Sequence, residues 1–298
     1  MGTRIEAAAT ANRRGWVFGR GALHLADAAA EACLERAHHE ADDIDLLIHT
    51  GIYKDHNTAE PALASIIQED VGANPVPHLG AHGTFSFDLL DGGCGFLSAA
   101  NVVDGFTRGG VARLSMIVAA DVDPSPRTSR GFPFAPAGGA VTLVPGRLGF
   151  ERFVQRTFDE DAGMFESRLH WAPEVGWHGR NIVEITEAPT FAEHCVEHAV
   201  EVTRDVMADA QLRPEQIELV IASQYPVTFG AQVARGLGIP LDRLPEVPHD
   251  LQRTHTAGPI AALETAIRTG RFTRAHHVLF ITAGAGISIS VAWYRSWD

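Results

Sequence analysis

Two stretches of this chain repeat the same order of helices and strands, and this internal repeat is the strongest constraint on the fold. In each copy an apolar strand follows a helix, and a small-residue helix then leads to a second apolar strand. A repeat of this length is too long for a solenoid unit and indicates duplication of one α/β half. Three pairs of segments match in order: residues 43–49 with 216–222, 95–110 with 255–270, and 114–120 with 278–282.

The repeat predicts an α/β chain of two halves, residues 1–180 and 181–298. Residues 44–50 (IDLLIHT) form a short run that is mainly apolar, which is typical of a strand buried on both faces. A stretch richer in Pro, Gly and Trp, residues 121–181, separates the halves. Because the halves are related by pseudo-symmetry, equivalent helix N-termini would converge at their junction. We therefore expect a shared active site there.

Residues 87–100 (FDLLDGGCGFLSAA) place Cys94 among glycines at the start of a predicted helix. The unpaired N–H groups and positive end of a helix favour thiolate over thiol. The glycines allow a tight turn and let a substrate carbonyl approach the backbone. Cys94 is therefore a candidate nucleophile; the alternative is a buried structural cysteine.

Composition excludes several classes of protein. The 298 residues are 45% hydrophobic and carry a formal net charge of −13, with a single lysine, Lys54. This balance argues against a nucleic-acid-binding protein, which would present a basic face. Three scattered cysteines do not form a disulfide framework, and no apolar run is long enough for a membrane span. We expect a cytoplasmic protein without a membrane anchor or a secretory signal.

Three segments resemble the thiolase-like condensing enzymes, most closely ketoacyl-ACP synthase III. The nucleophile segment of that family is similar to residues 87–110, its Gly- and Ala-rich strand to residues 132–144, and its C-terminal glycine-rich turn and last strand to residues 283–293. The resemblance implies a five-layer α-β-α-β-α fold, assembled as a homodimer or as a heterodimer with a homologue. It also implies that Cys94 accepts an acyl group from acyl-CoA or from an acyl carrier protein. The acyl group then passes to a second thioester by decarboxylative condensation, or to an alcohol or amine, with no permanently bound cofactor.

The catalytic set departs from the family pattern. An ungapped match places Gly93 in the nucleophile column, and a one-residue gap on each side of Cys94 restores the cysteine. Ser223 stands where the family has histidine; its hydroxyl could hydrogen-bond an oxyanion but could not shuttle protons as imidazole does. His255, in an H-x-x-G element before a helix, resembles the second histidine of another ketoacyl synthase branch. The predicted catalytic residues are therefore Cys94, His255 and Ser223.

Two alternatives remain open at this point. The chain could be a non-catalytic thiolase-fold subunit that binds acyl groups or supports an active homologous partner. Residues 194–198 (HCVEH) also match the H-x-x-E-H pattern of zinc hydrolases, with His194 and His198 on one helix face. An acidic, exposed helix that happens to contain histidines explains the same pattern. Because the sequence offers no evident third ligand, we predict no metal site.

Overall fold

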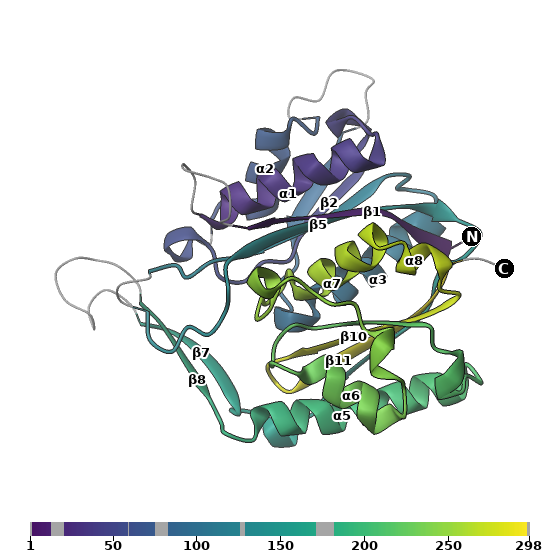
Figure 1. Cartoon of the computed structure of the whole chain (residues 1–298). Coiled ribbons are helices and arrows are strands. Elements are labelled where there is room, and N and C mark those ends of the chain that lie inside the picture. Colours follow the sequence, from purple (N-terminus) through teal and green to yellow (C-terminus); the bar gives the residue numbers. More distant parts are fainter. Residues whose placement is uncertain are drawn as a thin grey trace.

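The computed structural model describes residues 2–12, 21–58, 60–74, 83–125, 129–170 and 182–296. Within these ranges, helices and two β-sheets alternate as five layers (Figure 1). The predicted α-β-α-β-α arrangement is therefore confirmed.

The first sheet has the strand order β1-β5-β4-β2-β3. Strands β2, β3 and β4 run parallel, and β1 and β5 are antiparallel to their neighbours. Every residue of β4 is buried, because layers of helices cover both faces of this sheet. The strands are β1 Gly2–Asn12, β2 Leu46–His49, β3 Phe85–Asp88, β4 Ser115–Asp121 and β5 Ala137–Gly146.

The second sheet has the order β6-β11-β10-β9. Its first strand, β6, precedes residue 180 but pairs antiparallel with β11. The division of the chain at residue 180 stays a prediction. The strands are β6 Gly149–Thr157, β9 Leu219–Ala222, β10 His277–Gly284 and β11 Ser288–Arg295.

The helices form three layers around the sheets. Helices α1 and α2 cover the outer face of the first sheet, α3 and α7 lie between the sheets, and α5 and α6 cover the outer face of the second (Figure 1). Their bounds are α1 Ala22–Ala37, α2 Leu63–Val71, α3 Gly95–Arg108, α5 Phe191–Asp209, α6 Phe229–Leu237, α7 Gly258–Arg268 and α8 Arg271–Arg274.

The repeat seen in the sequence is visible in space. The series β2, α3, β4 of the first half corresponds to β9, α7, β10 of the second, and both central helices lie in the middle layer. Helix α3 begins at Gly95, as the sequence predicts. Equivalent helices from the two halves are thus brought together at the centre of the molecule.

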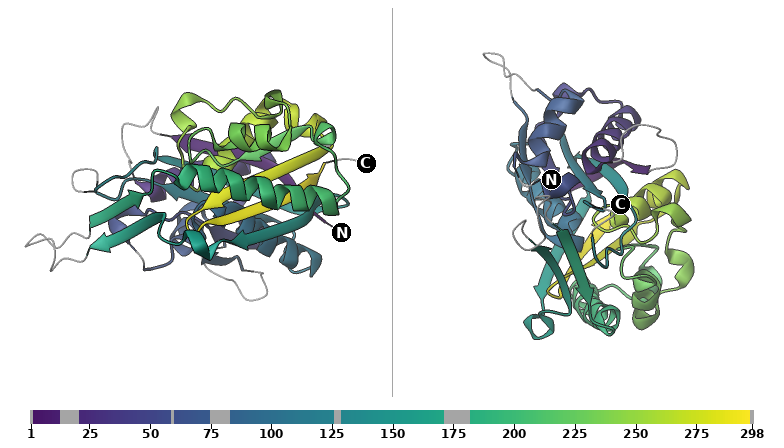
Figure 2. Two further views of the ribbon diagram at one scale, coloured as in Figure 1. Left: turned by 90° about the horizontal axis from the view of Figure 1, so that it is seen from below. Right: turned by 90° about the vertical axis from the view of Figure 1, so that its left-hand side faces the viewer.

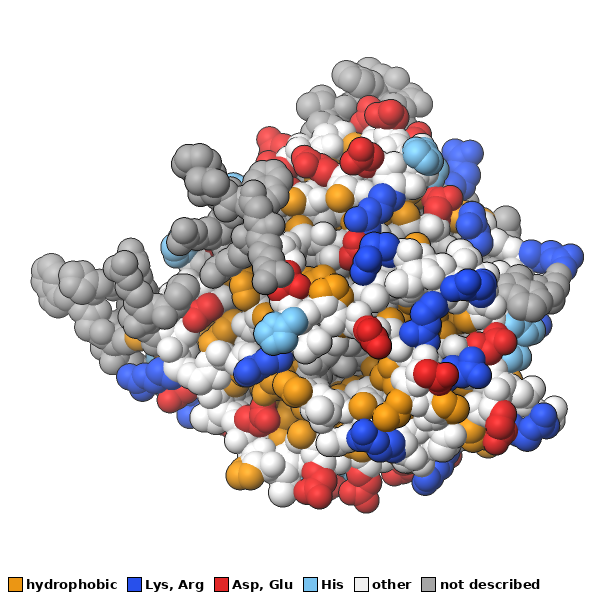
Figure 3. All heavy atoms as spheres, viewed as in Figure 1, with side chains coloured by type: hydrophobic (Ala, Val, Ile, Leu, Met, Phe, Trp, Pro, Cys, Tyr) orange, Lys and Arg blue, Asp and Glu red, His pale blue; other side chains and the backbone are white. Residues whose placement is uncertain are grey.

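A two-stranded ribbon projects from one side of these layers, as Figures 1 and 2 show. It consists of β7 Phe165–His170 paired antiparallel with β8 Ile182–Glu187. On the face seen in Figure 3, basic and acidic side chains are interspersed. Among the described residues, no helix is both long enough and apolar enough to cross a membrane.

Candidate functional site

A pocket of about 310 Å³ is lined by residues from both halves of the chain. Five of the lining residues are Phe or Tyr, and a glycine of the nucleophile segment, Gly92, also reaches the pocket. Such a concave, largely apolar site with a few polar groups is the usual form of a small-molecule site. The lining residues are Ile52, Tyr53, Gly92, Phe134, Phe165, Ser167, Phe191, Tyr225, Pro226, His255, Ala283, Gly284 and Ala285.

His255 is the predicted site residue that lines this pocket. Its ring centroid lies 4.3 Å from that of Phe134 and 5.4 Å from that of Tyr53, so aromatic contacts hold the imidazole. Its Nδ1 lies 3.5 Å from Oδ2 of Asp121. The arrangement gives the pocket an imidazole backed by a carboxylate, which is a common general acid–base pair.

Asp121, the last residue of β4, is a buried anion held by several donors. Its carboxylate accepts hydrogen bonds from the backbone N–H groups of Ile52 (2.8 Å), Tyr53 (2.7 Å) and Thr256 (3.0 Å), and from the Thr256 hydroxyl. Burial alone would raise the pKa of this carboxyl. The interaction with His255 and the hydrogen bonds outweigh burial and lower the pKa to about 2. Asp121 therefore stays ionised. Its hydrogen bonds hold the loop at Ile52 and Tyr53 and the backbone at Thr256, next to His255.

Cys94 lies beneath the pocket wall and does not line the pocket. It is the last residue of a short 3-10 turn, Gly92–Cys94, and is 0% exposed. Its thiol lies 3.3 Å from the Ser288 carbonyl oxygen and 3.8 Å from that of Thr282. Burial raises the pKa of the thiol to about 12. The sequence argument expected the opposite direction, because it considered the helix N-terminus and not the strands that enclose the sulfur.

Gly93 explains why this turn packs so closely. A Cβ atom at this position would lie 2.0 Å from the carbonyl oxygen of Ala283, a backbone atom of β10. Gly284 on the same strand sits directly over the cysteine, since a Cβ built there would lie 3.6 Å from Cys94 Sγ. Position 93, which an ungapped match places in the nucleophile column, therefore has no room for a side chain in this structure.

Ser223 is also buried, with 4% of its surface exposed. It follows β9, and its hydroxyl oxygen accepts a hydrogen bond from the backbone N–H of Ala283 (3.2 Å). Ser223 and Cys94 thus contact the same piece of β10, while His255 lies in the pocket that β10 lines with Ala283 and Gly284. The structure places all three predicted residues around this segment, and only His255 among them lines the pocket.

The sequence analysis missed three polar residues of this region: Asp121, Tyr53 and Tyr225. Asp121 could have been found, because a polar residue at the carboxyl end of an apolar parallel strand often lies at a site. Tyr53 and Tyr225 come from loops after β2 and β9, the equivalent strands of the two halves. The Tyr225 hydroxyl donates to the Glu187 carboxylate, which joins the pocket wall to the β7–β8 ribbon.

The layers, the duplicated halves and the pocket at their junction define a thiolase-like fold. Solved structures share it over almost the whole chain. The crystal structure of 3-oxoacyl-[acyl-carrier-protein] synthase III from Aquifex aeolicus has a TM-score of 0.80 at 19% identity, covering 99% of this chain and 100% of that one. Xanthomonas campestris OleA with bound lauric acid and lauroyl-CoA has a TM-score of 0.80 at 16% identity, covering 100% and 99%.

Sequence comparison also finds similarity to ketoacyl-ACP synthase III. Residues 207–296 match the family described as 3-oxoacyl-[acyl-carrier-protein (ACP)] synthase III C terminal. Beta-ketoacyl-[acyl-carrier-protein] synthase III of Roseiflexus sp. is 28% identical over 285 residues, covering 91% of this chain and 82% of the relative. The same enzyme of Aquifex aeolicus is 25% identical over 273 residues, covering 89% and 81%. The chain thus has a thiolase-like fold and is similar in sequence to ketoacyl-ACP synthase III.

Proposed function

We propose that this chain binds an acyl thioester in the pocket and takes part in acyl transfer or condensation. The observation that carries the proposal is the aromatic-lined pocket into which His255 projects, backed by buried Asp121. Two comparisons support it: relatives along most of the chain are named beta-ketoacyl-[acyl-carrier-protein] synthase III, and the OleA structure holds lauric acid and lauroyl-CoA. Acyl-CoA or acyl carrier protein would deliver the acyl group.

In the covalent form of this proposal, Cys94 is the acyl carrier. Its sulfur attacks the thioester carbonyl, the carbon–sulfur bond to the donor breaks, and the donor thiol leaves with a proton. His255 would move that proton, and Ser223 would lie near the oxyanion. This route requires the segment between Thr282 and Ser288 to shift, because that segment encloses the thiol.

The second candidate is a non-catalytic subunit that binds acyl groups or supports an active homologue. Three observations favour it: the Cys94 thiol is fully buried with a raised pKa, position 93 has no space for a side chain, and the Ser223 hydroxyl is engaged by Ala283. In this form, the pocket holds an acyl chain without forming a covalent bond.

Intact mass after incubation with a panel of acyl-CoAs separates the two candidates. For the covalent form, we expect an acyl adduct on the wild-type chain that disappears in Cys94→Ala. Cys33→Ala is the matched control, because Cys33 is another buried thiol whose pKa burial raises to about 12. It should keep the adduct.

Calorimetric titration with the same acyl-CoAs measures binding in parallel. Binding that His255→Ala weakens, without any adduct, would support the second candidate and reject the covalent one. Neither adduct nor binding from any donor would reject both forms of the proposal.

A further inference from the structure

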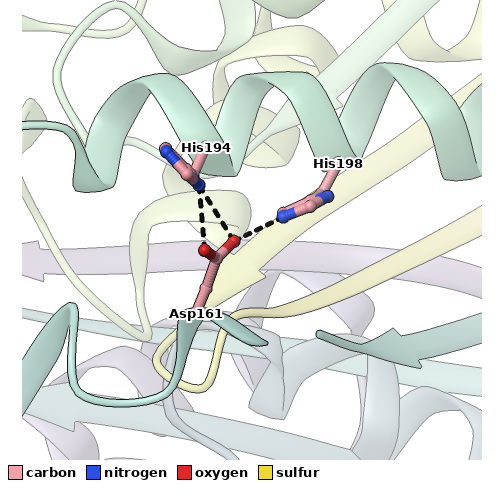
Figure 4. A group of neighbouring side chains, drawn as sticks. All are labelled: Asp161, His194 and His198. Atoms are coloured by element: carbon pink, nitrogen blue, oxygen red, sulfur yellow. Dashed lines mark hydrogen bonds and ion pairs between the residues drawn. The ribbon is translucent and has the colours of Figure 1, made fainter. Parts of the chain in front are cut away.

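Three side chains with metal-ligand chemistry converge at a place separate from the pocket (Figure 4). His194 and His198 lie one turn apart on α5, and Asp161 comes from the 3-10 turn Asp159–Asp161 that follows β6. Nδ1 of His194 lies 3.0 Å from the Asp161 carboxylate, and Nε2 of His198 lies 2.5 Å from it. One nitrogen or oxygen from each residue falls within 4.8 Å of the others.

We propose that Asp161, His194 and His198 bind a zinc ion, with a water molecule in the fourth position. Two imidazole nitrogens and one carboxylate oxygen form a known ligand set for tetrahedral zinc. The i, i+4 spacing on α5 places both imidazoles on one face. Asp161 is the third ligand that the HCVEH motif lacks in the sequence, and it lies more than thirty positions before that motif.

The site is largely preformed. The His198 ring stacks on Phe158 with a centroid separation of 3.7 Å, so its orientation is fixed. The side chain of Asp161 is 6% exposed and that of His198 12%, whereas His194 is 34% exposed. The ion and its water molecule would therefore reach the site past His194.

The charge around the three residues favours a cation. Among the described residues, the ion pairs of Asp161 are with His194 and His198, and no arginine or lysine pairs with it. These histidines hold the pKa of the Asp161 carboxyl below its usual range. Four exposed acidic residues neighbour the ligands in sequence on the same two elements: Asp159, Glu160, Glu193 and Glu197.

Zinc would take the place of the hydrogen bonds that now link Asp161 to the two histidines. Ligand atoms about 2.0–2.1 Å from a tetrahedral zinc ion lie about 3.3 Å apart, slightly farther than the 2.5 and 3.0 Å contacts here. The two contacts between Asp161 and the histidines would lengthen slightly to accommodate the ion.

A bound ion would also stiffen the wall of the pocket. Phe158, which packs on His198, exchanges two backbone hydrogen bonds with Ile287 (2.8 and 3.2 Å) in the turn between β10 and β11. Phe191, the first residue of α5, lines the pocket itself. Zinc would tie α5 to the end of β6 and so hold both of these segments in place. This role does not depend on the acyl chemistry.

The test is zinc titration of the chelator-treated, full-length chain by calorimetry at neutral pH, together with thermal unfolding. We expect one zinc ion per chain and a higher Tm with zinc, since a ligand that binds only the folded state stabilises it. His194→Gln and Asp161→Asn should each weaken binding by more than about tenfold, because loss of an outer-shell partner already costs that much.

His39→Gln is the matched control. His39 also pairs with carboxylates, Glu6 at 2.8 Å and Asp43 at 3.9 Å, but through opposite ring nitrogens that cannot share one ion. It should bind zinc as the wild type does. Absence of saturable zinc binding by the wild-type chain would overturn the proposal. So would wild-type affinity in folded His194→Gln or Asp161→Asn, with folding checked by circular dichroism.

Discussion

Replacement of Gly93 by alanine is expected to destabilise the folded chain by about 3 kcal/mol or more. The new Cβ would lie 2.0 Å from the Ala283 carbonyl oxygen, so backbone would have to move. That backbone cannot move freely, because Ala283 belongs to β10 and its N–H is bonded to Ser223. Urea unfolding of the variant and the wild type measures the difference.

Gly105→Ala is the control for this substitution. Gly105 lies in α3, and a Cβ there meets no heavy atom within 4 Å. Alanine should leave stability unchanged or raise it by up to about 1 kcal/mol, since it is the better helix former. If Gly93→Ala were as stable as Gly105→Ala, the 3-10 turn would not pack on β10 as described.

The same contact bears on engineering a nucleophile. Gly93→Cys, which puts cysteine in the nucleophile column of the ungapped match, introduces the same Cβ and should be destabilised in the same way. Restoring the residue type alone would therefore not restore the family site. A folded, acyl-accepting Gly93→Cys chain would contradict this expectation.

Asp121→Ala is expected to cost about 3 kcal/mol or more, because it leaves several buried hydrogen-bond donors without their charged acceptor. The substitution leaves the N–H groups of Ile52, Tyr53 and Thr256 without their acceptor. Asp123→Ala is the matched control, because Asp123 bonds Ser125 and Ser129 within its own loop. A cost of about 1 kcal/mol is expected there.

The Asp121 contribution should depend on pH in a defined direction. Its pKa is lowered from 3.8 to about 2 in the fold, so the ionised carboxyl stabilises the native state. This stabilisation is fully present above about pH 4 and is lost as the pH falls towards 2; its size is on the order of 2 kcal/mol. The free-energy difference between wild type and Asp121→Ala should therefore shrink over that range. A difference that stays constant between pH 5 and about pH 2 would show that the carboxyl titrates normally.

Much of the fold could be predicted from the sequence, because the repeated apolar strands and small-residue helices are local patterns. The start of α3 at Gly95 follows from them, whereas the five layers were expected from the resemblance to the condensing enzymes. The membership of β6 in the second sheet could not be predicted. Its neighbour β11 lies far along the chain, and the residues of β6 are only partly apolar.

The site was less accessible to prediction for a related reason. Cys94 was identified as a candidate from its own segment, but its exposure depends on Thr282 and Ser288, which contact it from across the fold. His194 and His198 were recognised as a pair, whereas Asp161 joins them only through tertiary packing. Spacing in the sequence shows which side chains share a face, but not which face of another element they meet.

The pairing of the outer strands has a consequence for how the chain folds. Residues 2–12 pair with residues 137–146, and residues 149–157 pair with residues 288–295, so both sheets depend on contacts of long range. Forming such contacts closes large loops, and this loss of chain entropy comes before the contacts stabilise the folded state. Folding rates therefore fall as the share of long-range contacts increases. Strand β11 lies inside its sheet, between β6 and β10, and its Tyr294 hydroxyl accepts a hydrogen bond from the N–H of Ile5. During synthesis, neither the second sheet nor its contact with β1 can be completed until β11 has left the ribosome.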